Sequence, residues 1–146
     1  MAVLPILTGA DNPALRIKTK RVPKITKDLL KLIKDMEATV EKVEGLGLAA
    51  PQVGQTHKVC IARLGGKLVP LINPDIIWKS KEQEEGEEGC LSLPGVWLSV
   101  PRAVSIVVRY LNAKGEEQER KLQELPARIV QHEVDHLNGV LIVDYR

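Results

Sequence analysis

Two histidines four residues apart, in the segment His132-Glu133-Val134-Asp135-His136, constrain the fold more than any other feature of the chain. Residues at this spacing lie on one face of an α-helix, so both imidazoles can bind one metal ion. Glu133 lies about 100° around the helix axis from His132, within reach of a water molecule on that metal. A chance match in an ordinary helix is the alternative, but two of the chain's three histidines lie in this segment. The motif therefore predicts a helix that carries part of a metal site.

The surrounding residues predict where this helix begins and ends. Pro126 can open a helix at its first turn, and Gly139 can end it just after Asn138. A second, amphipathic helix is predicted nearer the N-terminus, capped by Thr26 and ended at Gly45. Apolar residues recur there at three- and four-residue spacing: Leu29, Leu32, Ile33, Met36, Val40 and Val43.

Short apolar runs predict strands. Residues 59–64 and 67–72 flank Gly65-Gly66 as in a hairpin, and residues 104–111 and 117–122 flank a turn at 112–115. Residues 76–78 and 140–144 are expected to be further short strands, whereas segment 45–54 and the acidic run at 82–88 are expected to be irregular. This order predicts an α+β fold, with mostly antiparallel sheets around a central metal-binding helix and an amphipathic helix near the N-terminus.

Length and composition exclude several classes of protein. A chain of 146 residues is expected to form a single domain. A net charge of +2 and an aromatic content of 3% argue against a specific nucleic-acid-binding protein. Two cysteines cannot form a disulfide-rich framework, and no apolar run approaches the roughly 18 residues of a membrane helix. With no secretory signal at its start, the sequence predicts a reduced, cytoplasmic protein without a membrane partner.

Two histidines do not complete a catalytic metal site, which needs a third protein ligand and an open position. After His136 there is no histidine, and Asp144 is the single acidic residue, so the third ligand is expected upstream. A cysteine thiolate suits a borderline or soft divalent metal. Cys60 lies in an apolar strand segment and is expected to be a small core residue. Cys90 lies between a glycine and a proline in a segment that can present its sulfur, which favours Cys90 as the ligand.

Three separate motifs make the sequence resemble a peptide deformylase. They are GLGLAAPQ at residues 45–52, EGCLS at residues 88–92 and QHEVDHLNG at residues 131–139. Their order and approximate spacing also match, and the resemblance covers nearly the whole chain. Such enzymes remove the N-formyl group from the initiator methionine of new polypeptides and release formate. The resemblance therefore implies N-formylmethionyl peptides, as found on nascent chains, as the substrate.

The resemblance also implies a ligand set and a proton shuttle. Cys90, His132 and His136 would hold one divalent metal ion, with water in the fourth position. That ion is typically Fe²⁺ in the family, with Zn²⁺, Ni²⁺ or Co²⁺ able to occupy the site, and a Cys-His-His set by itself suits several of them. Glu133 would take a proton from water and deliver one to the leaving amine.

Further roles follow from matching positions in the family. The side-chain amide of Gln52 and the backbone N–H of Leu91 would stabilise the oxyanion, although without the resemblance Gln52 is better interpreted as a loop residue bonded to its own backbone. Ile129 would line the methionine pocket, and plain core packing explains it equally well. The peptide backbone would be held in an extended form at three positions: Leu46, Gly47 and Gly89.

Three alternatives remain at this point. A general metalloendopeptidase would share the histidine motif but would need a downstream third ligand, and a structural metal module would have no use for Glu133. An inactive relative acting as a binding protein is the third.

Many bacterial family members continue into a C-terminal helix, so residues 1–146 are expected to form a single catalytic domain that lacks this extension. The resemblance also implies transient contact with the ribosome, and the expected lack of this extension argues against docking through such a tail.

Overall fold

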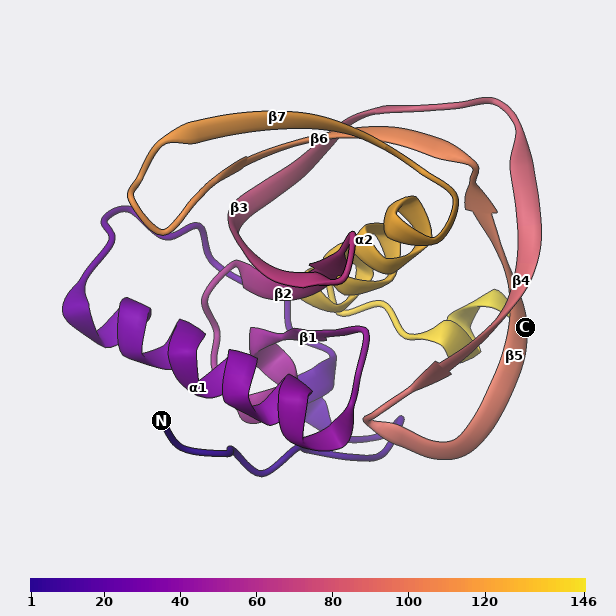
Figure 1. The fold of residues 1–146 in the computed structure, drawn as a ribbon. Helices are drawn as coiled ribbons and strands as arrows, with labels where there is room; N and C mark the ends of the chain where they lie inside the picture. The colour runs from indigo at the N-terminus through magenta and orange to yellow at the C-terminus, as the bar shows by residue number, and fades with distance from the viewer.

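A computed structural model describes residues 1–146 and has an α+β architecture with two antiparallel sheets (Figure 1). The larger sheet has the order β1-β2-β3-β6-β7, with strands β1 (Gly47–Ala49), β2 (Val59–Leu64), β3 (Lys67–Lys79), β6 (Ser105–Leu111) and β7 (Glu117–Gln123). The smaller sheet is the hairpin of β4 (Gln83–Cys90) and β5 (Leu93–Ala103). The two α-helices are α1 (Lys27–Val43) and α2 (Glu124–Leu137), and three short 3-10 helices are η1 (Pro13–Leu15), η2 (Ala50–Val53) and η3 (Ile142–Tyr145).

Strand β2 explains how the large sheet packs against both helices. Successive side chains of a strand point to opposite faces of the sheet. Val59 and Ile61 belong to the apolar cluster that contains the buried side of α1. Cys60, Ala62 and Leu64 belong to the cluster that contains the buried side of α2. The prediction that Cys60 is a core residue is confirmed, because its side chain is fully buried.

Helix α1 follows the predicted amphipathic pattern. The Thr26 hydroxyl caps its N-terminus by accepting a hydrogen bond from the N–H of Leu29 at 3.1 Å. The predicted end at Gly45 was wrong by one residue, because Glu44 adopts the left-handed conformation, with φ of 54°. The N–H of Gly45 then bonds to the carbonyl of Val40. The helix buries one face of its side chains: Leu29, Ile33, Met36 and Val40.

Helix α2 lies inside the curve of β6 and β7 and beside the β4–β5 hairpin (Figure 1). It begins at Glu124, before Pro126, which occupies the first turn, where its missing N–H has no helical partner to lose. Its apolar face packs on the large sheet through residues that include Ala127, Val130 and Leu137. This packing carries the histidine motif into the middle of the molecule.

Several local predictions were wrong, and each error has a physical cause. Residues 76–78 do not form a separate strand but continue β3 across two irregularities of register against β6. Segment 45–54 is not irregular, because it contains β1 and η2. Residues 140–144 do not form a strand; after a short connection the chain enters η3, and Leu141 and Ile142 pack against the hairpin instead of pairing with a sheet. These short elements depend on long-range packing that local patterns do not encode.

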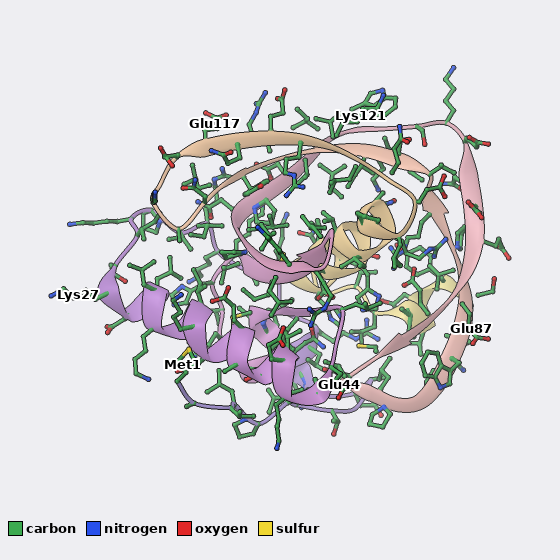
Figure 2. All side chains as sticks on the ribbon, viewed as in Figure 1. Met1, Lys27, Glu44, Glu87, Glu117 and Lys121 are labelled. Atoms are coloured by element: carbon green, nitrogen blue, oxygen red, sulfur yellow. The ribbon has the colours of Figure 1, made fainter.

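The acidic run at 82–88 was also predicted wrongly, since most of it belongs to strand β4. The strand is stabilised by its backbone pairing with β5, so it does not need an apolar sequence. Glu87 lies on the outer side of β4 and is exposed (Figure 2), whereas the neighbouring Glu88 is buried. The alternation of a strand thus turns one glutamate to water and the next to the interior. No helix in the structure is long and apolar enough to cross a membrane.

Asn73 attaches the N-terminal arm, residues 1–26 before helix α1, to the large sheet. It lies at an irregularity of β3 with φ of 53°, a left-handed conformation that asparagine tolerates better than most residues. Its side chain is buried and makes two hydrogen bonds with the backbone of Val22: Oδ1 accepts from the N–H at 2.7 Å, and Nδ2 donates to the carbonyl at 2.9 Å. One side chain therefore satisfies both backbone groups of a residue in the arm.

We predict that Asn73→Ala lowers the free energy of unfolding by about 2–4 kcal/mol, because it removes two buried hydrogen bonds and forces alanine into a left-handed conformation. Asn73→Gly is the matched control, since it loses the same hydrogen bonds without the backbone strain, and we expect it to be more stable than the alanine variant by about 1 kcal/mol. Denaturant unfolding of the three proteins measures both differences. If Asn73→Ala unfolds at the wild-type denaturant concentration, the arm does not depend on this contact.

Candidate active site

The structure brings together three potential metal ligands that are distant in sequence. Cys90 is the last residue of β4, and His132 and His136 project from one face of α2. One ligand atom from each of the three residues lies within 4.8 Å of the others. The sulfur of Cys90 is 3.3 Å from Nε2 of His136. Two imidazoles and a thiolate at this separation can converge on one divalent ion.

Glu88 orients His132 for such a role. The Nδ1 atom of His132 lies 2.8 Å from Oε1 of Glu88. An ionised carboxylate can only accept, so Nδ1 is the donor and Nε2 is the nitrogen left for a metal. Burial disfavours the charged imidazole, but neighbouring Cys90 and Glu88 outweigh it and raise the pKa of His132 to about 10. The groups around this ring therefore favour a positive charge, which a bound cation would supply in place of the proton.

His136 has the opposite electrostatic environment. Burial, helped by the charge of His132, holds the pKa of His136 well below its ordinary value. The ring is consequently neutral, which is the form that binds a metal. Two buried side-chain atoms have no hydrogen-bond partner within the protein, Nδ1 of His136 and Oε1 of Glu133, and both belong to the histidine motif. Unpartnered buried polar atoms are rare, so their occurrence together favours a functional site.

Glu133 lies next to the proposed ligands and is only 4% exposed. Burial raises the pKa of Glu133 to about 7, a value suited to a group that takes up and gives back a proton near neutral pH. The carboxylate lies close to Gly47 of β1. A Cβ atom on Gly47 would lie 2.6 Å from Oε2 of Glu133 and 2.7 Å from the carbonyl oxygen of Ile61. Glycine at this position is therefore what allows helix α2 to bring the carboxylate against the sheet.

A cavity of about 450 Å³ opens onto these residues. Apart from His136, which is buried beside Cys90, every residue singled out from the sequence lines it: Leu46, Gly47, Gln52, Gly89, Cys90, Leu91, Ile129, His132 and Glu133. The ring of Trp97 covers Gly89, where an added Cβ would lie 2.6 Å from it. Trp97 is 65% exposed, and it forms an apolar rim with two other exposed side chains, Leu46 and Leu125.

The two ends of the Gln52 amide fit the two interpretations that the sequence left open. Its Oε1 accepts a hydrogen bond from the backbone N–H of Ala49 at 2.9 Å, as a loop residue bonded to its own backbone would. This contact fixes the orientation of the amide and turns Nε2 towards the site. Nε2 donates to Ser92 Oγ at 3.0 Å and lies 3.8 Å from the sulfur of Cys90. The side chain is 2% exposed, so a donor is held in a defined position beside the proposed ligands.

Sequence reasoning missed the charged residues behind the ligands. Glu88 accepts two hydrogen bonds from Arg102, through Nε and Nη2, each at 2.9 Å. Arg102 also donates to Asp135 at 2.6 Å, and the Tyr145 hydroxyl donates to the same carboxylate oxygen at 2.6 Å. Arg128 donates to Glu88 at 2.6 Å. The spacing of Glu88, two residues before Cys90 on one strand, is the signal that could have placed it beside the site.

Comparisons with known proteins show the family to which the chain belongs. The family model described as polypeptide deformylase matches residues 3–146. A peptide deformylase from Pseudothermotoga lettingae is 46% identical over 133 residues, which cover 91% of this chain and 77% of the relative. Among solved structures, the peptide deformylase from Thermotoga maritima superposes with a TM-score of 0.95 at 41% identity, covering 99% of this chain and 98% of that chain.

A second solved structure is similar over the same extent. It is a class I type b peptide deformylase from Acinetobacter baumannii with Met-Ala-Ser bound, with a TM-score of 0.95 at 37% identity, covering 99% of each chain. The match spans both sheets, both helices and all the motifs that surround the cavity. The chain therefore belongs to the peptide deformylase family, the metallo-hydrolases that remove the N-formyl group from newly made polypeptides.

Proposed function

We propose that this chain deformylates N-formylmethionyl peptides at one divalent metal ion held by Cys90, His132 and His136. The observation that carries the proposal is the convergence of these three residues within 4.8 Å, beside a buried glutamate at the end of an open cavity. The donor set fits a metal, because a thiolate and two imidazoles suit borderline divalent ions. When bound, the ion supplies a Lewis acid that polarises the formyl oxygen and makes water more acidic.

Glu133 is the proposed proton shuttle. Its carboxylate faces the cavity and its pKa is raised by burial to about 7, so it can take a proton from the attacking water. The carbon–nitrogen bond of the formamide then breaks, and Glu133 delivers the proton to the leaving amine. The products are formate and a peptide with a free N-terminus.

Two donors are proposed to stabilise the oxyanion that forms during the attack. They are Nε2 of Gln52, which already faces the sulfur of Cys90, and the backbone N–H of Leu91, the residue after that cysteine. Donors held in advance in a dry site stabilise developing charge without reorganising, and each one typically contributes about 3–4 kcal/mol. Both candidates line the cavity next to the ligands.

The rest of the cavity is proposed to bind the peptide. Gly47 and Gly89 lie on its walls in the edge strands β1 and β4, and Leu46 lies just before β1, so an extended backbone can pair there. Ile129 lies one turn before His132, is mostly buried, and lines the cavity, which suits contact with an apolar methionine side chain. All the residues with proposed roles belong to one catalytic domain.

The proposal extends to the metal and the cellular setting. Fe²⁺ is the proposed physiological ion, on the strength of the family resemblance, and the same ligands suit Zn²⁺, Ni²⁺ and Co²⁺. Nascent chains in the cytoplasm are the proposed source of substrate, with transient contact at the ribosome.

Formate release from formyl-Met-Ala-Ser, measured with the metal content of the same sample, tests the function. Cleavage of unformylated peptides at internal bonds would instead indicate an endopeptidase.

The first prediction from the site concerns its thiolate. Cys90→Ser should weaken metal binding by at least about tenfold, because a hydroxyl is a much poorer ligand than a thiolate for these ions. Cys60→Ser is the matched control, since Cys60 is buried in the core on the sheet. Competition with a chromophoric chelator gives the dissociation constants. Should Cys60→Ser lose its metal while Cys90→Ser retains it, the assigned ligand set is wrong.

A second prediction separates catalysis from metal binding. Glu133→Gln keeps the shape of the side chain and removes its basicity, so we expect turnover to fall by about 10²–10⁴-fold with the metal retained. Metal analysis and formate release on the same preparation measure the two effects. Loss of the metal in this variant would place Glu133 among the ligands and contradict its role as a shuttle.

A third prediction concerns Gln52. Gln52→Leu preserves volume and removes the donor, and we expect kcat to fall by about 10²–10³-fold with a smaller change in KM. Ser92→Ala removes a hydrogen-bond partner of Gln52 but leaves the donor, so its loss of kcat should be much smaller. Steady-state kinetics on formyl-Met-Ala-Ser distinguish the two variants. Equal losses would mean that the amide is needed for packing and not for catalysis.

A further inference from the structure

Helix α2 carries one more side chain that reaches the β4–β5 hairpin, Arg128, about one turn before His132. Its Nη1 donates to Oε2 of Glu88 at 2.6 Å and to the carbonyl of Val100 at 2.9 Å. Its Nη2 donates to the carbonyl of Glu84 at 2.7 Å. Glu84 and Glu88 lie on β4 and Val100 lies on β5. A single guanidinium on the helix therefore holds both strands of the hairpin.

Gly86 makes room for this guanidinium. On strand β4, the alternate residues Gly86, Glu88 and Cys90 face α2. A Cβ atom at Gly86 would lie 2.8 Å from Cζ of Arg128 and 3.0 Å from its Nε and Nη2. Glycine inside a strand costs about 0.5–1 kcal/mol of stability relative to alanine, so its occurrence in mid-strand requires a reason. The guanidinium packed on the bare backbone provides that reason.

The carboxylate of Glu88 has every acceptor direction in use. Oε1 faces Nη2 of Arg102 and Nδ1 of His132, and Oε2 faces Nε of Arg102 and Nη1 of Arg128. Rotation of the carboxylate would break at least one of these contacts. Arg128 thus limits the positions that Glu88, and with it the ring of His132, can adopt.

We propose that Arg128, whose guanidinium packs on Gly86, is a positioning residue. It holds the hairpin against α2, so that Cys90 and His132 lie at metal-binding distance. The proposal rests on the proposed metal site but can fail independently of it. Arg128 contributes through Glu88 and through the strand backbone, without contact to the ligand atoms of Cys90 or His136. Its side chain also lines the cavity, which affects the choice of variant.

The first arm of the test is Arg128→Met, which keeps an aliphatic chain on the cavity wall and removes all three hydrogen bonds. Release of Zn²⁺ from the loaded protein to excess chelator should be at least about tenfold faster, the lower end of the effect of losing a residue that orients a metal ligand. The visible spectrum of the Co²⁺-loaded protein should shift as the ligand geometry relaxes. With saturating metal, kcat should fall while KM for formyl-Met-Ala-Ser changes little.

The second arm tests whether Arg128 depends on its packing against Gly86. Gly86→Ala keeps every donor and charge but pushes the guanidinium off β4, so it should accelerate Zn²⁺ release as Arg128→Met does. In the double variant the flexible methionine can avoid the new methyl group, so release should be no faster than for Arg128→Met alone. Arg109→Met is the matched control, because Arg109 on β6 is an exposed arginine paired with Glu117 and Glu119. Its Zn²⁺ release should equal that of the wild type.

Each outcome bears on the proposal. If Gly86→Ala and Arg128→Met both release Zn²⁺ within about twofold of the wild-type rate, the proposal is wrong. If the effects of the two substitutions add in the double variant, Arg128 does not act through its packing on Gly86. If Arg128→Met does not fold, Gly86→Ala against the wild type still decides. A wild-type chain that binds metal but releases no formate would overturn the proposed function, while the Zn²⁺ release rates would still decide the role of Arg128. A wild-type chain that binds no metal would overturn both.

Discussion

The carboxylate of Glu88 joins the two parts of the molecule that carry the proposed metal ligands. One part is the hairpin that carries Cys90, and the other is the helix that carries His132 and His136. No ladder of backbone hydrogen bonds connects them, because α2 packs on the large sheet and the hairpin forms a sheet of its own. Side-chain contacts connect the two parts instead: Glu88 bonds to His132 and Arg128, Arg102 bonds to Asp135, and Gln131 bonds to the backbone of Ala103. The separation of the proposed ligands therefore depends on a few polar and charged side chains in addition to the apolar core.

This arrangement is tolerated because each of these charges has a partner of opposite sign. Two arginines, Arg102 and Arg128, face two carboxylates, Glu88 and Asp135. An unpaired charge in such a place would cost several kcal/mol or change its protonation state. Burial acts to raise the pKa of Glu88, but hydrogen bonds from Arg102 and His132 outweigh it and hold that pKa well below the usual range. Glu88 consequently stays ionised near neutral pH and remains an acceptor for His132.

The large sheet positions Glu133, the proposed proton shuttle. Strands β1 and β2 lie against α2, and Gly47 lets the carboxylate of Glu133 approach the sheet backbone. The resulting burial raises the pKa of Glu133, while Glu88, on the hairpin beside α2, stays ionised. Two carboxylates beside one site thus differ in protonation behaviour, because Glu133 is buried with an oxygen that has no hydrogen-bond partner, whereas Glu88 lies between two guanidinium groups.

Much of the fold was predictable from local patterns. Apolar spacing indicated α1, and the histidine motif with Pro126 and Gly139 indicated α2. The Gly65-Gly66 turn between two apolar runs indicated the β2–β3 hairpin. Local patterns failed where pairing or packing with distant segments determines the conformation. The acidic strand β4 and the terminal η3 show this, since one is stabilised by β5 and the other by apolar packing on the hairpin.

The sequence by itself also identified the residues that meet at the cavity. The histidine motif, the cysteine and the three motifs of the resemblance are contiguous segments, so they can be recognised without coordinates. Only the tertiary structure revealed that Glu88 turns inward from an acidic run and that Arg102, Arg128 and Asp135 surround it. A charge run carries no local sign of which member is buried, because that depends on partners supplied by other strands and by the helix. Chemistry encoded in short motifs was thus determined by the sequence, and the charged framework that positions it was decided by the packing of distant segments.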